Sequence, residues 1–268
     1  MPSQSEINHN GPQNICSGSI KLNEVEVHSG WARFTADTVG QWHSEIDYQS
    51  ITDIHIGVSD PFGLFCTSSD VLNSVFYDLG RIIDEMPGLK SLTIEMILDD
   101  QNKLEEWSLG ELALKTHSLQ HLKIANLGMT TEDNRSQLLE FAALAVSSSA
   151  CLQTLHIEGT CSNAVDGGKF MQVLADDRCD SLQNLTIADE RAWFENGRDD
   201  CKDSLVTIIA RQAELKLLDL HDNGFTEEQE QQIRSAAANP ECRLIVNEEE
   251  FKAYETEQKQ TEAAANEP

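Results

Sequence analysis

The chain has few basic side chains: 19 lysines and arginines stand against 46 aspartates and glutamates in 268 residues, a net charge of −27. Such a charge repels nucleic-acid phosphates and anionic lipid headgroups, so neither nucleic acid nor a membrane surface is an expected partner. Hydrophobic residues still make up 40% of the chain, which is enough to bury a core and excludes global disorder. The partner that the charge favours is a basic protein.

Signals for secretion, membrane insertion and metal-ribbon folds are also missing. The first residues are polar, so no Sec-type signal peptide is predicted, and no run of about 18 apolar residues occurs. The seven cysteines are widely spread and form no Cys-x-x-Cys pair, which argues against a disulfide scaffold or a zinc ribbon. We therefore expect free thiols and a cytoplasmic protein, with export by a specialised secretion machine as the open alternative.

Common catalytic motifs are absent as well. The sequence contains no nucleophile elbow, no His-Glu-x-x-His, no dinucleotide fingerprint and no phosphate-binding loop. The run from Asp166 to Lys169 lacks the glycine spacing and the Ser or Thr of such a loop, so we interpret it as a turn that opens a helix. Cys161 and Cys179 would act as nucleophiles only if a histidine and an orienting group met them in space. We expect no enzyme, no catalytic residue and no cofactor.

What the sequence does contain is an internal repeat. Six hexamers share the pattern apolar-x-x-apolar-x-apolar, and their starts lie 30 to 38 residues apart. They run from Ile51 to Ile56, Leu89 to Ile94, Leu119 to Ile124, Leu152 to Ile157, Leu182 to Ile187 and Leu215 to Leu220, with a weaker seventh copy ending at Val246. A near-regular period of this size is typical of a solenoid.

Helical periodicity occupies the segments between the hexamers. It is clearest from Val71 to Met86, where Asp70 can cap the helix and Pro87 can stop it. Thr226 and Gln229 have the spacing of a capping box at the start of the last helix of this kind. A short strand followed by a helix, repeated, requires parallel strands because each right-handed crossover returns the chain in the same direction. The predicted fold class is α/β.

The segment LKLLDLHDNGF, from Leu215 to Phe225, resembles the leucine-rich repeat signature, with Asn223 at its asparagine position. The unit length and the helix in each unit resemble the ribonuclease-inhibitor-like branch of that family. The resemblance covers residues 51–246 as six to seven units, and it implies a curved solenoid with parallel strands on the concave face and helices on the convex face. Other units replace the asparagine with Ser59, Ile97, Leu127, Thr160 and Glu190, so we expect less regular turns there.

Strand alternation then assigns each hexamer position to a face. Positions one, four and six point into the core, while positions three, five and seven face the concave surface. Candidate partner-binding residues on these rows are Asp53, His55, Thr93, Glu95, His121, Lys123, His156, Glu158, Asn184, Thr186, Asp219 and His221. Seven strands about 4.8 Å apart span about 30 Å, which is wide enough for a protein or peptide.

Four of the eight histidines fall on these rows. One interpretation is a pH-sensitive or metal-supported contact surface, because imidazole titrates near neutrality. The other is that these are ordinary exposed strand residues. The second is favoured, since only His121 and His156 are on neighbouring strands and no third ligand stands at metal spacing. We expect no metal site.

The two ends of the chain lie outside the repeat. Residues 1–17 are polar and expected to be disordered. Residues 18–50 partly alternate apolar and polar residues, and we interpret them as an N-terminal cap, with a targeting or docking module as the alternative. Residues 247–268 form an acidic C-terminal tail, for which we expect a short helix, anchored by Phe251 and Tyr254, and then a solvated end.

These features predict a non-enzymatic protein-binding module that recognises or inhibits a protein partner through its concave face. The resemblance implies a second possibility, a regulator of an enzyme such as a GTPase activator, although no matching loop residue is present. A third is a secreted effector of a host-associated microbe that acts on host proteins. The sequence does not indicate an oligomeric state.

Overall fold

The computed structural model describes most of the chain from Asp53 onward and two strands before it. The described residues are 17–22, 25–30, 49, 51–58, 76, 79–80, 83–96, 109–110, 112–113, 115–126, 132–160, 164–176, 181–194, 199–237 and 239–265. Of residues 1–17, which were expected to be disordered, Ser17 begins a strand and the others lie outside the described part of the chain, as do residues 23–24, 31–48 and 50 of the expected N-terminal cap.

One sheet of nine strands runs through the described residues, in the order β2-β1-β3-β4-β5-β6-β7-β8-β9. The strands are β1 (Ser17–Leu22), β2 (Val25–Gly30), β3 (Asp53–Val58), β4 (Ser91–Met96), β5 (His121–Asn126), β6 (Thr154–Glu158), β7 (Asn184–Ala188), β8 (Leu217–Asp219) and β9 (Arg243–Ile245). Strands β3 to β9 are all parallel, whereas β1 is antiparallel to both β2 and β3. The predicted α/β class with parallel strands is confirmed.

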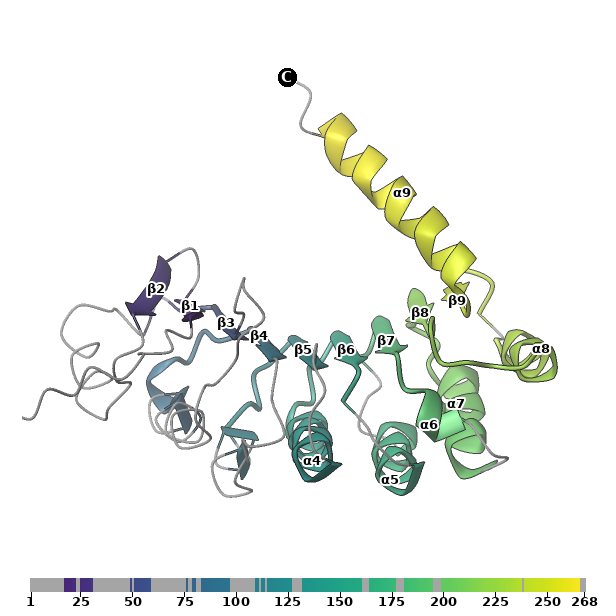
Figure 1. The fold of residues 1–268 in the computed structure, drawn as a ribbon, viewed down its shortest axis with the longest axis horizontal. Coiled ribbons are helices and arrows are strands. Elements are labelled where there is room, and N and C mark those ends of the chain that lie inside the picture. The colour runs from purple at the N-terminus through teal and green to yellow at the C-terminus, as the bar shows by residue number, and fades with distance from the viewer. Residues whose placement is uncertain are drawn as a thin grey trace, which may run out of the picture.

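Helices α4 to α8 gather along one side of the sheet, whereas α9 stands away from them at the β9 end (Figure 1). The helices are α4 (Glu132–Ser148), α5 (Ala164–Ala175), α6 (Arg191–Phe194), α7 (Asp199–Arg211), α8 (Glu227–Ala236) and α9 (Glu248–Ala265), with a short 3-10 helix at Ile83–Glu85. Helix α4 contacts α5, α5 contacts α7, and α7 contacts α8. Of the helix expected from Val71 to Met86, Phe76 and residues 79–80 are helical, and most of the remainder lies outside the described residues. The capping box at Thr226 is present.

The core lies between the sheet and the helices. All eighteen apolar hexamer positions are buried, with at most 5% of each residue exposed. They are Ile51, Ile54, Ile56, Leu89, Leu92, Ile94, Leu119, Leu122, Ile124, Leu152, Leu155, Ile157, Leu182, Leu185, Ile187, Leu215, Leu218 and Leu220. The predicted inward-facing positions are therefore confirmed.

Register places equivalent hexamer positions side by side. Third-position residues pair from Asp53 through His121 to Arg243, and fifth-position residues pair from His55 through Lys123 to Ile245. A shift of one residue would have reversed the two faces of each strand. The third- and fifth-position rows predicted from the sequence are therefore the rows of paired residues in the sheet.

Buried polar side chains link the turns after the last strands. Asn223 donates from Nδ2 to the carbonyl oxygens of Ile187 at 2.6 Å and Leu220 at 2.8 Å, and its Oδ1 accepts from the Glu190 backbone N–H at 2.9 Å. Glu190 occupies the same position one unit earlier, and its Oε1 accepts from the backbone N–H of Thr160 at 2.6 Å and from its hydroxyl at 3.0 Å. Unrelated side chains therefore keep one ladder, and the expectation of an irregular turn is wrong at Glu190.

The turns themselves share a backbone conformation. The residue just before each ladder position has a positive φ: 61° at Gly159, 54° at Asp189 and 59° at Asp222. Aspartate tolerates this left-handed region better than most side chains because it can form local hydrogen bonds. The polypeptide thus turns in the same way after β6, β7 and β8.

The C-terminal segment differs from the expected short helix and solvated tail. Helix α9 runs for 18 residues, from Glu248 to Ala265, and it stands away from the sheet at the β9 end (Figure 1). Contacts near its start hold it: Phe251 stacks on His221, the guanidinium carbon of Arg243 lies 4.8 Å from the centre of the Tyr254 ring, and Arg243 also pairs with Glu257. The acidic segment therefore continues as a helix to Ala265, and most of its remaining described residues are exposed.

Candidate functional site

The strand face of β3 to β7, on the side away from the helices, carries most of the candidate residues. Because neighbouring side chains on a strand point to opposite faces, the apolar hexamer positions that pack towards the helices leave the third, fifth and seventh positions on this side. Asp53 and His121 are exposed, while His55, Thr93, Glu95, Lys123, His156, Glu158 and Asn184 are partly exposed. We call these nine side chains the strand-face network.

Glu95 joins three neighbouring strands within the network. Its carboxylate lies 3.1 Å from Nε2 of His55 on β3 and 2.6 Å from Nζ of Lys123 on β5. Burial alone raises the pKa of Glu95, but the hydrogen bonds and charges of Lys123 and His55 outweigh it and hold the pKa below its ordinary value of 4.5. A carboxylate that bridges an imidazole and an ammonium group links β3, β4 and β5.

A second pair continues the network on β6. Nε2 of His156 lies 3.0 Å from Glu158 Oε2, and this hydrogen bond is the main reason that the pKa of Glu158 falls below its ordinary value. Lys123 on β5 adds a favourable charge to Glu158 as well as to Glu95. Beyond this pair, Asn184 donates from Nδ2 to Thr154 Oγ1 at 3.3 Å. The contacts therefore reach from β3 to β7.

Acid should weaken the part of the fold that Glu95 stabilises. A carboxylate whose folded pKa is depressed stabilises the protein above its unfolded pKa, near 4.5, and that stabilisation is lost as the pH falls through the lower folded value. We therefore expect Glu95→Gln to flatten the fall of melting temperature in acid. Thermal unfolding from neutral pH to well below 4.5 would measure this. Glu140→Gln, at an exposed α4 site, is the matched control, and a Glu95→Gln curve parallel to the wild-type curve would contradict the assignment.

Three candidate residues are not accessible as expected. Thr186, Asp219 and His221 are 8%, 4% and 9% exposed. The ring of Phe251 lies flat against His221, with centroids 3.8 Å apart and planes at 12°. His221 Nδ1 lies 2.8 Å from Asp219 Oδ1. The placement of Asp219 and His221 on an open binding surface was therefore wrong, because the start of α9 covers that end of the sheet.

Electrostatics at this covered end differ from those of the open network. Burial lowers the pKa of His221, but the hydrogen bond and charge of Asp219, with the charges of Asp222 and Glu158, outweigh burial and raise it above 6.5. Among the described residues, a grouping of donors close enough for a metal ion also lies here and not on the strand-face network. Sequence reasoning missed the grouping because its members come from a turn and a helix that are far apart in the chain.

The strand-face network presents both charged and neutral polar groups on the side of the sheet away from the helices. Its cationic and anionic groups are paired with each other, and they offer hydrogen-bond donors and acceptors to a ligand. Burial raises the pKa of the Cys242 thiol, which disfavours the reactive thiolate. Cys161 and Cys179, the other nucleophiles considered, lie outside the described residues.

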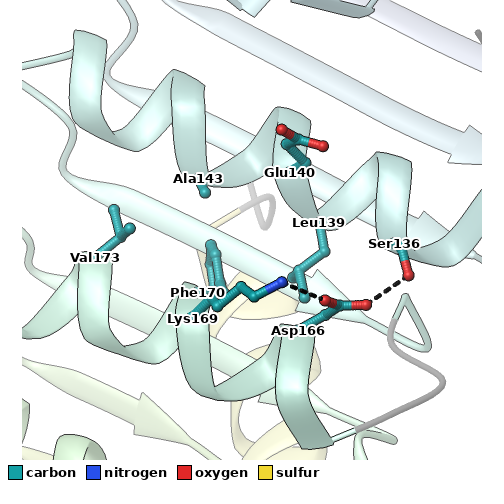
Figure 2. Close-up of a pocket in the computed structure, with 8 residues that line it drawn as sticks. All are labelled: Ser136, Leu139, Glu140, Ala143, Asp166, Lys169, Phe170 and Val173. Atoms are coloured by element: carbon teal, nitrogen blue, oxygen red, sulfur yellow. Dashed lines mark hydrogen bonds and ion pairs between the residues drawn. The ribbon is translucent and has the colours of Figure 1, made fainter. Parts of the chain in front are cut away.

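A pocket of about 200 Å³ lies on the helix side, between α4 and α5. Its floor is apolar, with Leu139, Ala143, Phe170 and Val173. At one end, Ser136 Oγ donates to Asp166 at 2.6 Å and Lys169 Nζ lies 3.2 Å from the same carboxylate (Figure 2). The polar groups at this end of the pocket therefore bind one another.

None of the helices in the described ranges combines the length and the apolar character needed to cross a bilayer. No family model and no curated protein matches the sequence of this chain.

Proposed function

We propose that this protein is a non-enzymatic binding module, a curved leucine-rich-repeat solenoid of the ribonuclease-inhibitor-like kind, whose concave strand face recognises a protein partner. Support for the repeat architecture comes from the hexamers buried in register and from the turn ladder at Thr160, Glu190 and Asn223. Stacked units of this kind bury a continuous core and leave one long face of strands for binding.

The observation that carries the proposal is the strand-face network itself. It runs across five neighbouring strands, which is about 20 Å at the usual strand spacing. Its side chains are held by mutual contacts such as those of Glu95 with His55 and Lys123. Side chains that are already ordered lose less entropy when a partner binds, so binding by this face is favoured over binding by freely moving surface residues.

A basic protein is the partner that the charge supports. The net charge of −27 attracts positive surfaces over a distance and speeds encounter, while the mixed network sets specificity. Acids also line the start of α9, at Glu248, Glu249 and Glu250, beside the end of the strand face. Binding should therefore weaken as salt rises, because exposed charges are screened.

Enrichment of bound proteins by matched variants tests this function. The strand-face variant combines Lys123→Gln, His156→Gln and Glu158→Gln. Its control combines Lys169→Gln, Glu140→Gln and His117→Gln, the same residue types at exposed sites off the network. A true partner should be retained by the wild type and the control. Its affinity for the strand-face variant should fall at least about tenfold, which corresponds to about 1.4 kcal/mol of binding free energy. Equal retention by both variants would overturn the proposal.

A further inference from the structure

Three potential ligands meet where the turn after β8 faces the start of α9. A ring nitrogen of His221, a carboxylate oxygen of Asp222 and a carboxylate oxygen of Glu248 lie within 4.8 Å of one another. The turn after β8 supplies the first two residues, and Glu248, the first residue of α9, is the third. One imidazole with two carboxylates is a donor set that zinc accepts, with water completing the tetrahedron.

His221 is held as metal-binding histidines usually are. Asp219, which is 4% exposed, places Oδ1 2.8 Å from Nδ1 of the ring and 3.2 Å from the His221 backbone nitrogen. This contact orients the ring and leaves Nε2 as the nitrogen available to an ion. Nε2 has no hydrogen-bond partner among the residues that the structure describes, although His221 is only 9% exposed. The ring of Phe251 stacks on one face of the His221 imidazole.

The two carboxylates can adjust to an ion. The side chains of Asp222 and Glu248 are 46% and 44% exposed, and their present partners are Arg191 at 3.4 Å and Lys252 at 2.9 Å. Exposed ion pairs of this kind contribute little, so an ion can replace them. Donors around a tetrahedral zinc lie about 3.4 Å apart, so the carboxylates need only rotate inward.

From this geometry we propose that His221, Asp222 and Glu248 form a site for a divalent transition-metal ion of the zinc class, which ties α9 to the turn after β8. The buried Asp219 acts as a positioning residue that orients His221. Glu158 and Asp219 add negative charge close to His221, which favours a cation there. This inference goes beyond the protein-binding role and does not depend on it.

Zinc titration of the full chain with its thiols reduced, in competition with a chromophoric chelator, tests the site. We expect one zinc ion per chain, and Asp222→Asn and Glu248→Gln should each weaken binding by at least about tenfold. Two controls match them: Asp189→Asn stands at the equivalent turn position with the same backbone conformation, and Glu249→Gln is the exposed neighbour of Glu248. Both controls should bind zinc as the wild type does.

Hydrogen exchange supplies a second readout that does not depend on competition with the chelator. Zinc should slow amide exchange in the first turns of α9 in wild type and in Glu249→Gln, but not in Glu248→Gln. Binding that survives both ligand variants would overturn the proposal, as would binding that is lost with Cys242→Ser or equally tight binding of magnesium. Absence of one-to-one zinc binding by the wild type would overturn it as well.

Discussion

Replacing Asn223 with alanine should lower the free energy of unfolding by about 3 kcal/mol. The change leaves three buried backbone groups without a partner: the carbonyls of Ile187 and Leu220 and the N–H of Glu190. Each unsatisfied buried group costs about 1–3 kcal/mol, and partial relaxation keeps the sum near the lower end. Urea unfolding followed by circular dichroism would measure the loss.

Asn184→Ala is the control for this effect. Asn184 is partly exposed on the strand face, and its Nδ2 donates to Thr154 Oγ1 at a long 3.3 Å, so its loss should cost less than about 1 kcal/mol. Asn223→Asp adds a finer test, because aspartate keeps the acceptor but loses both donors and should still be clearly destabilised. If Asn223→Ala were as mild as Asn184→Ala, the ladder would not stabilise the turns.

Adding a single methyl group at Gly167 should destabilise the protein, by about 1–3 kcal/mol. Gly167 lies in α5 against Trp193, and a Cβ built there would come within 2.6 Å of the indole ring. Trp193 is completely buried and packs edge-on against Phe170 at 5.8 Å, so it has little room to move. This clash outweighs the gain in helix propensity of about 1 kcal/mol that alanine normally brings.

Gly168 is the matched control, one residue further along the same helix. A Cβ there meets only Cys201 Sγ, at an ordinary 3.8 Å. We therefore expect Gly168→Ala to be neutral or to stabilise the fold by up to about 1 kcal/mol, because it gains helix propensity without a clash. Thermal unfolding of the two variants side by side gives the comparison. Equal melting temperatures would show that Trp193 does not constrain α5.

Local patterns account for the parts of the fold that were predictable. A hexamer such as Leu152 to Ile157 has two inward positions separated by one outward position, and this period of two belongs to strands. Repetition every 30 or so residues then requires parallel pairing in equivalent register, since unequal register would break the shared core. The nine residues of the strand-face network follow from that register alone.

Contacts between distant segments account for what was missed. No local signal shows that Glu190 takes the hydrogen-bonding role of an asparagine, because its carboxylate bonds to Thr160 in the preceding turn. Burial of His221 depends on Phe251, which follows a further helix and strand. The sequence singled out Phe251 as an anchor but offered no means of finding the residue beneath it.

The length of the last helix could not be predicted from its local sequence either. The acidic segment from Glu248 has charges typical of a solvated tail, yet its glutamates suit the first turn of a helix. Contacts of its first turns, including the bond from the Val246 backbone N–H to Glu250 at 2.9 Å, supply the start that an isolated helix lacks. Beyond Glu257, which pairs with Arg243, most of the described residues of the helix are exposed.

Carboxyl footprinting of the complex with the enriched partner tests directly whether the partner binds the strand face. A water-soluble carbodiimide labels accessible carboxylates, and mass spectrometry compares free and bound protein. The account predicts that Glu95 and Glu158 on the strand face lose most of their labelling in the complex, while the exposed Glu140 on α4 and Glu228 on α8 keep theirs. Protection of Glu140 or Glu228, with Glu95 and Glu158 labelled as in the free protein, would place the partner on the helices and contradict it.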